Sequence, residues 1–564
     1  MRYFLLSFVL FFVGNILFAQ HTFVPLDADA ERLIQRYEIR TGTSRNSLFT
    51  DIRPYNRANL AEMTRLFRNS SLQKSHIDDF NVDYLLSENI PWSEINPEDS
   101  KKAIFGNFYK SKANLYQVNE PGFNLFINPG FLLEAGKSDL NEKPLYTNTR
   151  AIEIRGDIGN KVGFYTFISE NQMRIADHER QFVNSWKTYP GAHLIKSFKD
   201  GGIDFFQARG YITFSPLKEI SFQFGQDRNF IGNGMRSLLL SGFATDYPFL
   251  KINTKIWRLN YMNLFAKLTD RYGSITGTNI TRPHPVKYLA MHYLSIDLFD
   301  KLNVGLFESV TFHDNNGNGR GFDFSYLNPI IFYRSVEHQL GDPDKMMVGL
   351  NMSYLPVKNL QLYGQFMLNE FRINDLLDNN GHNANKFGYQ AGAKYIDVAG
   401  ITNLDLQVEY NRVRPYSYAH YAVSGDYAVN SYSHFNQPLA HPLGANFSEF
   451  ALRLDSQPLK KLRIGLVLIN ANYGADSSGS NWGGNIFLDY RTIEQELGNF
   501  VGQGVKTNLL ITEAWASYQL LHNLFVDIDF RYRDLKSDLP KRKSKNLYFG
   551  SALRLNLTRK SWNY

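Results

Sequence analysis

The chain has 564 residues and no cysteine, which excludes a disulfide framework, a thiolate metal site, a thiol nucleophile and a lipid-modified N-terminal cysteine. Its 61 basic and 54 acidic residues give a net charge of only +7. The signs alternate along most segments, which argues against a nucleic-acid partner. An aromatic content of 15% with a mean hydropathy of -0.34 is typical of a barrel with an apolar outer face and a polar lumen.

The first 19 residues have the pattern of a secretory signal peptide. Arg2 precedes an apolar stretch at residues 3–13, and the small residue Ala19 follows. The stretch is shorter than the roughly 20 residues of a membrane-spanning helix. We therefore expect cleavage between Ala19 and Gln20, with a retained membrane anchor as the alternative.

Residues 20–110 are predicted to form a small periplasmic helical region. Apolar residues recur at helical spacing between positions 26 and 37, behind Asp27 as a predicted cap. Two further amphipathic helices are expected at residues 57–68 and 77–88. This region would precede the barrel in the periplasm.

From residue 111 to 564 we predict an outer-membrane β-barrel, because the apolar period changes to two. Between residues 403 and 412, apolar Leu404, Leu406, Val408 and Tyr410 alternate with polar Asp405, Gln407, Glu409 and Asn411. Similar runs predict about 18 antiparallel strands, starting near residues 123, 149, 161, 203, 219, 247, 257, 286, 303, 345, 359, 386, 403, 446, 461, 507, 523 and 544.

Short turns, such as those at 216–218 and 356–358, alternate with long loops along the chain, as periplasmic turns and external loops do in barrels. A soluble β-sandwich is the alternative. A charged side chain facing lipid costs roughly 2 to 4 kcal/mol, so Glu409, Arg453 and Arg531 are expected to face the lumen. Bulky lumenal residues predict little open channel.

No catalytic constellation is recognised, so we expect a protein that is not an enzyme and has no cofactor or metal. His178-Glu179 begins a zinc-protease motif, but Phe182 occupies the position of its second histidine, so we expect this pair on a loop surface. Residues 314–319 match the first half of a calcium loop, whereas Ser325 replaces its bidentate glutamate. A structural turn and a calcium site are both compatible with this segment.

Aromatic residues crowd a long loop that also holds His420, His434 and His441. Tyr416, Tyr418 and Tyr421 lie in this loop, and Trp186 and Trp482 lie in two other long loops. Two interpretations are open: the loop is stabilised by its own aromatics, or these rings form a platform on which sugar rings stack.

The run at residues 225–246, GQDRNFIGNGMRSLLLSGFATD, lacks the Lys-Ser/Thr ending of a phosphate loop. Its arginines and amides are predicted to form a positive, polar patch near the barrel mouth or lumen, suited to an anionic polymer. The candidate polysaccharide contacts are Arg228, Asn229, Asn233, Arg236, Tyr416, Tyr418 and Trp482.

That run resembles the Wzi capsule assembly family as it occurs in Bacteroidetes, and equally the relatives in that phylum labelled RemB and associated with gliding motility. The other segments that carry the likeness are KYLAMHYLSIDLFDKLNVGLFESV (287–310), LNP (327–329), EYNRVRPYSYAH (409–420) and QPLAHPLGANFSE (437–449). One departure is FIGNG at 230–234, where an aromatic-Gly-Pro-Gly turn is expected.

The resemblance implies an 18-stranded barrel with a periplasmic helical region and a lectin-like role in capsule assembly. We therefore predict an outer-membrane protein whose partners are membrane lipid and surface polysaccharide. A gliding-motility component, with motility or export machinery as partner, and a diffusion porin are the alternatives.

Overall fold

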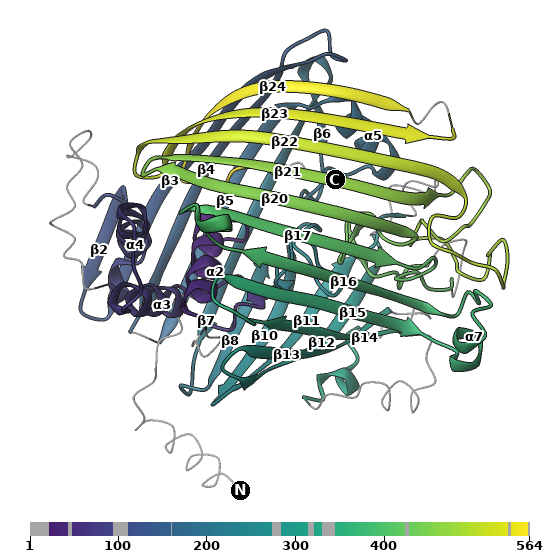
Figure 1. Cartoon of the computed structure of the whole chain (residues 1–564), viewed down its shortest axis with the longest axis horizontal. Coiled ribbons are helices and arrows are strands. Elements are labelled where there is room, and N and C mark those ends of the chain that lie inside the picture. Colours follow the sequence, from purple (N-terminus) through teal and green to yellow (C-terminus); the bar gives the residue numbers. More distant parts are fainter. Residues whose placement is uncertain are drawn as a thin grey trace, which may run out of the picture.

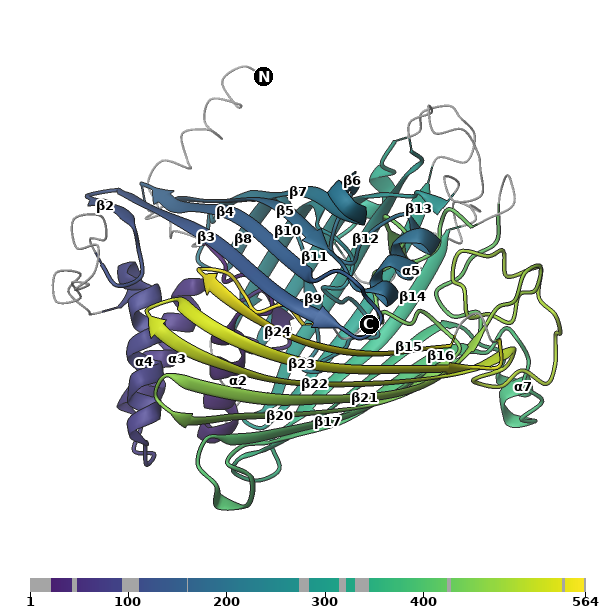
Figure 2. The same cartoon turned by 90° about the horizontal axis from the view of Figure 1, so that it is seen from above.

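The computed structural model describes residues 22–42, 48–93, 111–159, 161–272, 284–313, 321–329, 344–422, 428–539 and 543–561. They form one closed β-barrel with helices at one end and folded loops at the other (Figures 1 and 2). The predicted signal peptide and the calcium-like segment at 314–319 lie outside these residues. No described helix is both long and apolar enough to cross a bilayer.

Eighteen long antiparallel strands make up the described wall, and the last of them pairs with the first to close it. They are β3 (Phe123–Ser138), β4 (Leu145–Ile158), β5 (Val162–Arg174), β7 (Gly202–Phe214), β8 (Ile220–Asp227), β10 (Tyr247–Ile256), β11 (Leu259–Thr269), β12 (Val286–Phe299), β13 (Leu302–His313), β14 (Lys345–Tyr354), β15 (Leu360–Glu370), β16 (Lys386–Tyr395), β17 (Leu404–Val413), β20 (Phe447–Leu459), β21 (Leu462–Ala475), β22 (Val505–Leu521), β23 (Leu524–Ser537) and β24 (Ser544–Leu555).

Shorter elements decorate this wall. Strand β2 (Tyr116–Glu120) pairs with the start of β3, β6 (Lys196–Phe198) pairs with β7, and β18 (Ser433–His434) pairs with β19 (Gln437–Pro438). The loops contain α5 (Asp177–Trp186), α7 (Ile373–Leu377) and the 3-10 turns η3 (Lys199–Gly201), η5 (Phe324–Leu327) and η6 (Val398–Gly400).

The predicted barrel of 18 strands is confirmed. Every predicted strand start lies within two residues of the observed one except that of β4, which was expected near 149 and begins at Leu145. The extra residues of β4 continue its ladder with β3, since Leu145 pairs with Gly136.

The strands alternate apolar residues outside with polar residues inside. Leu362 and Phe366 are 43% and 41% exposed on the outer face, whereas Glu409 is 1% exposed and faces the lumen. Arg453 and Arg531 also face inward, as predicted, each beside an acidic group. An apolar outer belt around a polar interior is the arrangement that a lipid bilayer requires of a barrel.

One loop lies against the outside of the wall. Phe322 and Tyr326 pack their rings 5.3 and 4.7 Å from that of outward-facing Phe312. Nearby on the same outer face, His292 and Glu308 are buried 3.9 Å apart. Ionisable groups are costly against lipid, so at this place the loop replaces lipid as the neighbour of the wall.

Three helices form a small domain with its own core: α2 (Asp29–Thr41), α3 (Arg57–Asn69) and α4 (His76–Glu88), followed by the turn η1 (Ile90–Trp92). The helices expected at 57–68 and 77–88 are confirmed. Asn56 caps α3 through its side chain, and Ser75 with Asp78 forms a capping box on α4. The predicted cap Asp27 is wrong, because α2 begins after Ala28 without a side-chain cap.

These helices do not stand apart from the barrel but pack into its short-turn end (Figure 2). Arg36 of α2 contacts Asp397 at 2.6 Å and Asp405, both of the barrel. The Tyr84 hydroxyl of α4 donates to Asn523 in a wall turn at 2.6 Å. The helical region therefore closes this end of the lumen.

A loop from the opposite end enters the lumen to meet them. Residues 228–246, here called the plug loop, connect β8 to β10 and contain β9 (Phe230–Ile231). Strand β9 pairs antiparallel with β1 (Ile52–Arg53) of the helical region. The Gly232 amide adds a hydrogen bond to the Asp51 carbonyl at 2.8 Å. The two closures thus touch inside the barrel.

Candidate functional site

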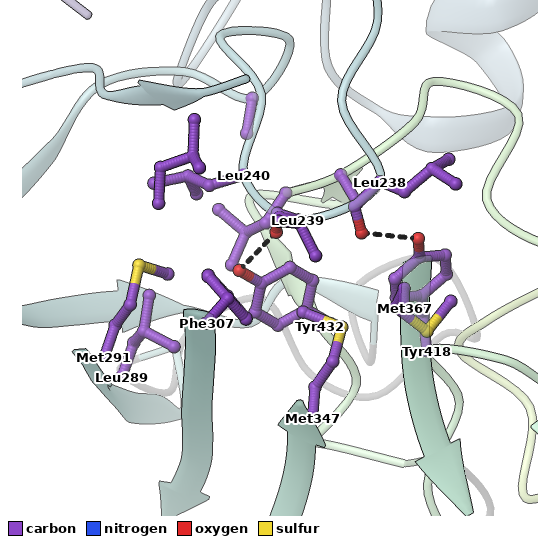
Figure 3. Close-up of a cluster of buried hydrophobic side chains, with 14 of the residues drawn as sticks. Leu238, Leu239, Leu240, Leu289, Met291, Phe307, Met347, Met367, Tyr418 and Tyr432 are labelled. Carbon is purple, nitrogen blue, oxygen red and sulfur yellow. Dashed lines mark hydrogen bonds between the residues drawn. The ribbon is translucent and has the colours of Figure 1, made fainter. Parts of the chain in front are cut away.

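The plug loop is held by an apolar cluster that continues the interior of the wall (Figure 3). Leu238, Leu239 and Leu240 are fully buried. The hydroxyls of Tyr418 and Tyr432 donate to the carbonyls of Leu238 and Leu239, each at 2.8 Å. Each buried tyrosine thus satisfies a buried peptide group while its ring fills the lumen.

Two wall glutamates anchor the polar half of the plug loop. Glu409 accepts from the backbone amides of Met235 at 2.8 Å and Arg236 at 3.1 Å. The Arg236 guanidinium donates to Glu449 at 3.1 and 3.2 Å, and His441 lies 3.0 Å from the same carboxylate. Charge-assisted bonds of this kind are the strong ones, so the loop is fixed to two neighbouring strands.

Two glycines of the FIGNG segment are required by close approach. Gly232 has φ +123°, and a Cβ there would lie 2.3 Å from Gln365 Nε2. A Cβ on Gly234 would lie 2.5 Å from Glu409. Although FIGNG departs from the expected aromatic-Gly-Pro-Gly turn, it retains the two glycines that this close packing requires.

The plug loop carries four of the predicted polysaccharide contacts. Asn229 and Asn233 are each 1% exposed. Arg228 lies within the lumen, 3.8 Å from Asp27 of the helical region. Arg236 is buried beside Glu449, so of the two predicted positions, the barrel mouth and the lumen, the structure shows the lumen.

The other three predicted contacts belong to the loops at the mouth. Tyr416 and Tyr418 are each 1% exposed, and Tyr416 donates to the Asn481 carbonyl at 3.1 Å. Trp482 is half-buried, and its amide donates to Asp476 at 2.5 Å. For the two tyrosines, the interpretation of a loop stabilised by its own aromatics fits. As polysaccharide contacts, all seven residues stay predictions.

The histidines do not gather into a metal site. His434 accepts from the Thr269 amide at 3.0 Å, and His441 lies beside Glu449. Glu179, expected at a loop surface, is instead buried at the start of α5, where it accepts from the Ala176 amide. Across the described ranges, no three acidic or histidine side chains are grouped as metal ligands.

Aromatic residues form two clusters at the long-loop end, and all of them except the buried Phe487 are half-buried. The Trp186 cluster joins Trp186, Tyr272 and Phe487 from three loops, with Tyr272 stacked on Phe487 at 4.9 Å and Trp186 at 5.4 Å from Phe487. Asn485 donates to the Tyr272 hydroxyl at 3.1 Å. The cluster places aromatic faces and an amide side by side.

The Tyr490 cluster joins Tyr421, Tyr490 and Arg491. The two tyrosine rings meet edge to face at 5.8 Å, and the Arg491 guanidinium lies 4.9 Å from the Tyr421 ring centre. Lys386 lies 3.5 Å above the Tyr490 ring. Sequence reasoning noticed Trp186 and Tyr421 but missed their partners, because these come from separate loops; aromatic residues in each long loop were the available signal.

Fold and interior together define a plugged, 18-stranded β-barrel of the kind that spans bacterial outer membranes. Residues 204–546 match the family described as capsule assembly protein Wzi. The chain therefore belongs to the Wzi capsule assembly family.

Solved structures are also similar to this chain. Wzi from Escherichia coli, described as a carbohydrate-binding β-barrel of the outer membrane involved in group 1 capsule assembly, aligns over 95% of this chain and 100% of its own, with 11% identity and a TM-score of 0.56. OccD3 and OccK8 of Pseudomonas aeruginosa each align over 76% of this chain and over 91% and 97% of their own, with 11% and 6% identity and TM-scores of 0.40 and 0.41. No curated protein matches this sequence.

Proposed function

We propose that this protein is an outer-membrane anchor that holds surface polysaccharide during capsule assembly. Membership of the Wzi family supports the process, and the E. coli Wzi barrel, which binds carbohydrate, supports the kind of ligand. In this proposal the long loops face outward and the helical region faces the periplasm. The first 19 residues serve as the export signal and are removed after Ala19.

The observation that carries the proposal is the pair of aromatic clusters at the long-loop end. Sugar rings stack on aromatic faces through their C–H groups, while neighbouring amides and guanidinium groups bond their hydroxyls. The Trp186 cluster supplies this pairing through Tyr272 and Asn485. The Tyr490 cluster supplies it through Tyr421 and Arg491.

Two weak binding sites hold a polymer more firmly than they hold a small molecule. Each stacked ring contributes weakly, but two sites that engage one chain raise its effective concentration at the second site. The filled lumen argues against the porin alternative, because the plug loop and the helical region meet inside it.

The test is a deletion strain complemented with variants. Deletion is expected to release polysaccharide into the medium without stopping its synthesis. Trp186→Ala with Tyr272→Ala is expected to lower the surface-bound fraction several-fold, because the stacking faces are lost. The matched control is Phe500→Ala, an aromatic residue 57% exposed in the same end of the barrel but outside both clusters.

Heat-dependent gel migration of each variant checks that the barrel is folded. If the deletion strain keeps its surface polysaccharide and loses only spreading on agar, the gliding-motility alternative replaces this proposal. If Phe500→Ala lowers retention as much as the double variant does, the clusters are not the contact surface.

A further inference from the structure

A cavity of about 310 Å³ lies inside the barrel, on the side of the helical region. It is enclosed by α2, by the Phe230 and Met235 end of the plug loop, and by wall residues from β16 to β24. Its lining holds nine basic side chains, namely Arg32, Arg36, Arg53, Arg57, Lys394, Arg453, Arg463, Arg554 and Arg559, against the seven acidic residues Asp27, Asp29, Glu31, Glu88, Glu153, Asp405 and Asp455.

Several buried polar atoms of this lining have no hydrogen-bond partner. Among the described residues, Arg36 Nε, Arg57 Nε and Arg463 Nη2 are such donors, and Glu31 Oε1 is such an acceptor. All four residues are at least nine-tenths buried. Native proteins rarely leave buried polar groups unsatisfied, and several around one cavity call for a bound group.

Arg463 shows how an acceptor would be held. Its Nη1 forms an ion pair with Asp29 at 2.6 Å, while Nη2 of the same guanidinium has no hydrogen-bond partner. A guanidinium held by one carboxylate is well placed to bind a second one.

One of the seven acidic residues in the lining, Glu31, opposes an anion only in part. Burial raises the pKa of Glu31 to about 7, against which the Arg53 charge acts only in part. Around neutral pH this carboxyl therefore carries a proton for much of the time, and it donates as well as accepts.

We propose that this cavity is a binding site for an acidic sugar unit, whose carboxylate and hydroxyls accept from the unpartnered guanidinium groups. The volume is about ten times the roughly 30 Å³ share of one water molecule, so a bare inorganic anion would leave most of it empty. The Trp515 ring in the lining adds apolar surface for a sugar ring, beside the Arg559 guanidinium at 4.5 Å.

The inference rests on the proposed function in taking a saccharide as the ligand, and it places a second, interior site behind the outer clusters. The test is calorimetric titration of the purified full chain in detergent with glucuronate, glucose and inorganic phosphate. Glucuronate is expected to bind at least about tenfold more tightly than either of the others, because only it combines a carboxylate with a sugar ring.

Arg463→Gln and Arg57→Gln are each expected to weaken glucuronate binding about tenfold, the loss of one charge-assisted bond. Arg68→Gln, on the exposed face of α3, is the matched control and is expected to bind as the unaltered chain does. Heat-dependent migration on gels shows that each variant is folded.

Three results would overturn the site: no heat of binding with glucuronate, equal affinity for phosphate, or unchanged affinity in both arginine variants. Because the outer clusters are tested separately by polymer retention on cells, a failure here with normal retention leaves the proposed function standing. The Trp186→Ala, Tyr272→Ala double variant is expected to lose polymer retention on cells and still to bind glucuronate in the calorimeter as the unaltered chain does.

Discussion

The same barrel wall is closed in two different ways at its two ends. At the loop end the plug loop is packed by an apolar cluster that includes Leu239, Phe307 and Met347. At the helix end, the apolar contacts with the wall form two smaller clusters, one around Ile39 and Leu355 and one around Phe23 and Tyr211. Most attachment there is by ion pairs and hydrogen bonds. Apolar packing is insensitive to pH, whereas buried ion pairs depend on every partner being present and charged.

The largest effect is expected from a charge placed in the apolar closure. Leu239→Asp loses a fully buried side chain and buries an unpaired carboxylate, at a cost of about 4 kcal/mol or more in the free energy of unfolding. Thermal unfolding monitored by gel migration measures it. Leu497→Asp, at a loop leucine 52% exposed, is the control. Equal stability of the two variants would mean that the plug loop contributes nothing to the barrel.

A slightly smaller and more local effect is expected at the helix end. Arg36→Ala removes the nearest cation from Asp397 and Asp405 and leaves them only Arg40 and Arg32, each at 3.7 Å, which costs about 3 kcal/mol. Hydrogen exchange is expected to accelerate in α2, α3 and α4 while the wall strands keep their protection. Arg68→Ala is the matched exposed variant. Uniform acceleration through the wall would contradict the view that the helices are a separately attached closure.

The helical region and the outer loop that holds His420 are expected to respond to pH in opposite directions. Burial raises the pKa of Glu38 to about 8 from its ordinary 4.5, so the folded helical region holds this proton more tightly than the unfolded chain. Its contribution is full below about pH 4.5 and is lost as pH rises through 8. Burial lowers the pKa of His420 in the loops to about 3 from 6.5. That contribution is full above about pH 6.5 and is lost as pH falls toward 3.

Hydrogen exchange at about pH 5.5 and pH 8.5, corrected for the intrinsic rate, separates the two. Glu38→Gln is expected to flatten the response of the helical region alone. Although burial alone would raise the pKa of Glu88, its hydrogen bond and ion pair with His522 lower it to about 2, so this group does not titrate in that window. If the helical region and the His420 loop respond to pH in the same direction, this prediction is wrong.

The smallest effects come from deleting one hydroxyl at each end. Tyr418→Phe leaves the buried Leu238 carbonyl unsatisfied, at a cost of about 1 to 3 kcal/mol. Tyr84→Phe frees Asn523, a half-buried turn residue that water can reach, and costs about 1 kcal/mol or less. Denaturation of the two variants side by side measures the difference. A larger loss of stability in Tyr84→Phe than in Tyr418→Phe would contradict the expectation that water reaches the helix end more readily than the loop end.

The wall could be predicted from sequence because its signal is local. Along β17, each residue faces either the outside or the lumen, and the period of two records that choice within ten residues. The predicted inward position of Glu409 followed directly. Helices α3 and α4 were equally predictable from their spacing.

The filling of the lumen could not be predicted in the same way, because its contacts join distant parts of the chain. Tyr418 meets Leu238 across 180 positions, and Tyr293 meets Asp51 across 242. A tyrosine in a polar loop has the same local pattern whether its ring faces solvent or a buried carbonyl. For this reason the sequence left open whether Tyr416 and Tyr418 stabilise their own loop or form a platform for sugar rings, and the structure buries both.

The pairing of β1 with β9 gives the molecule a mechanical property. Tension applied to the outer loops passes along the plug loop into β9 and from there, through backbone hydrogen bonds, into Ile52 and Arg53. The Arg53 guanidinium, 3.6 Å from the centre of the Phe230 ring, adds a side-chain contact to the same joint. A load on one face of the barrel thus has a path to the helices on the other face through the interior of the molecule.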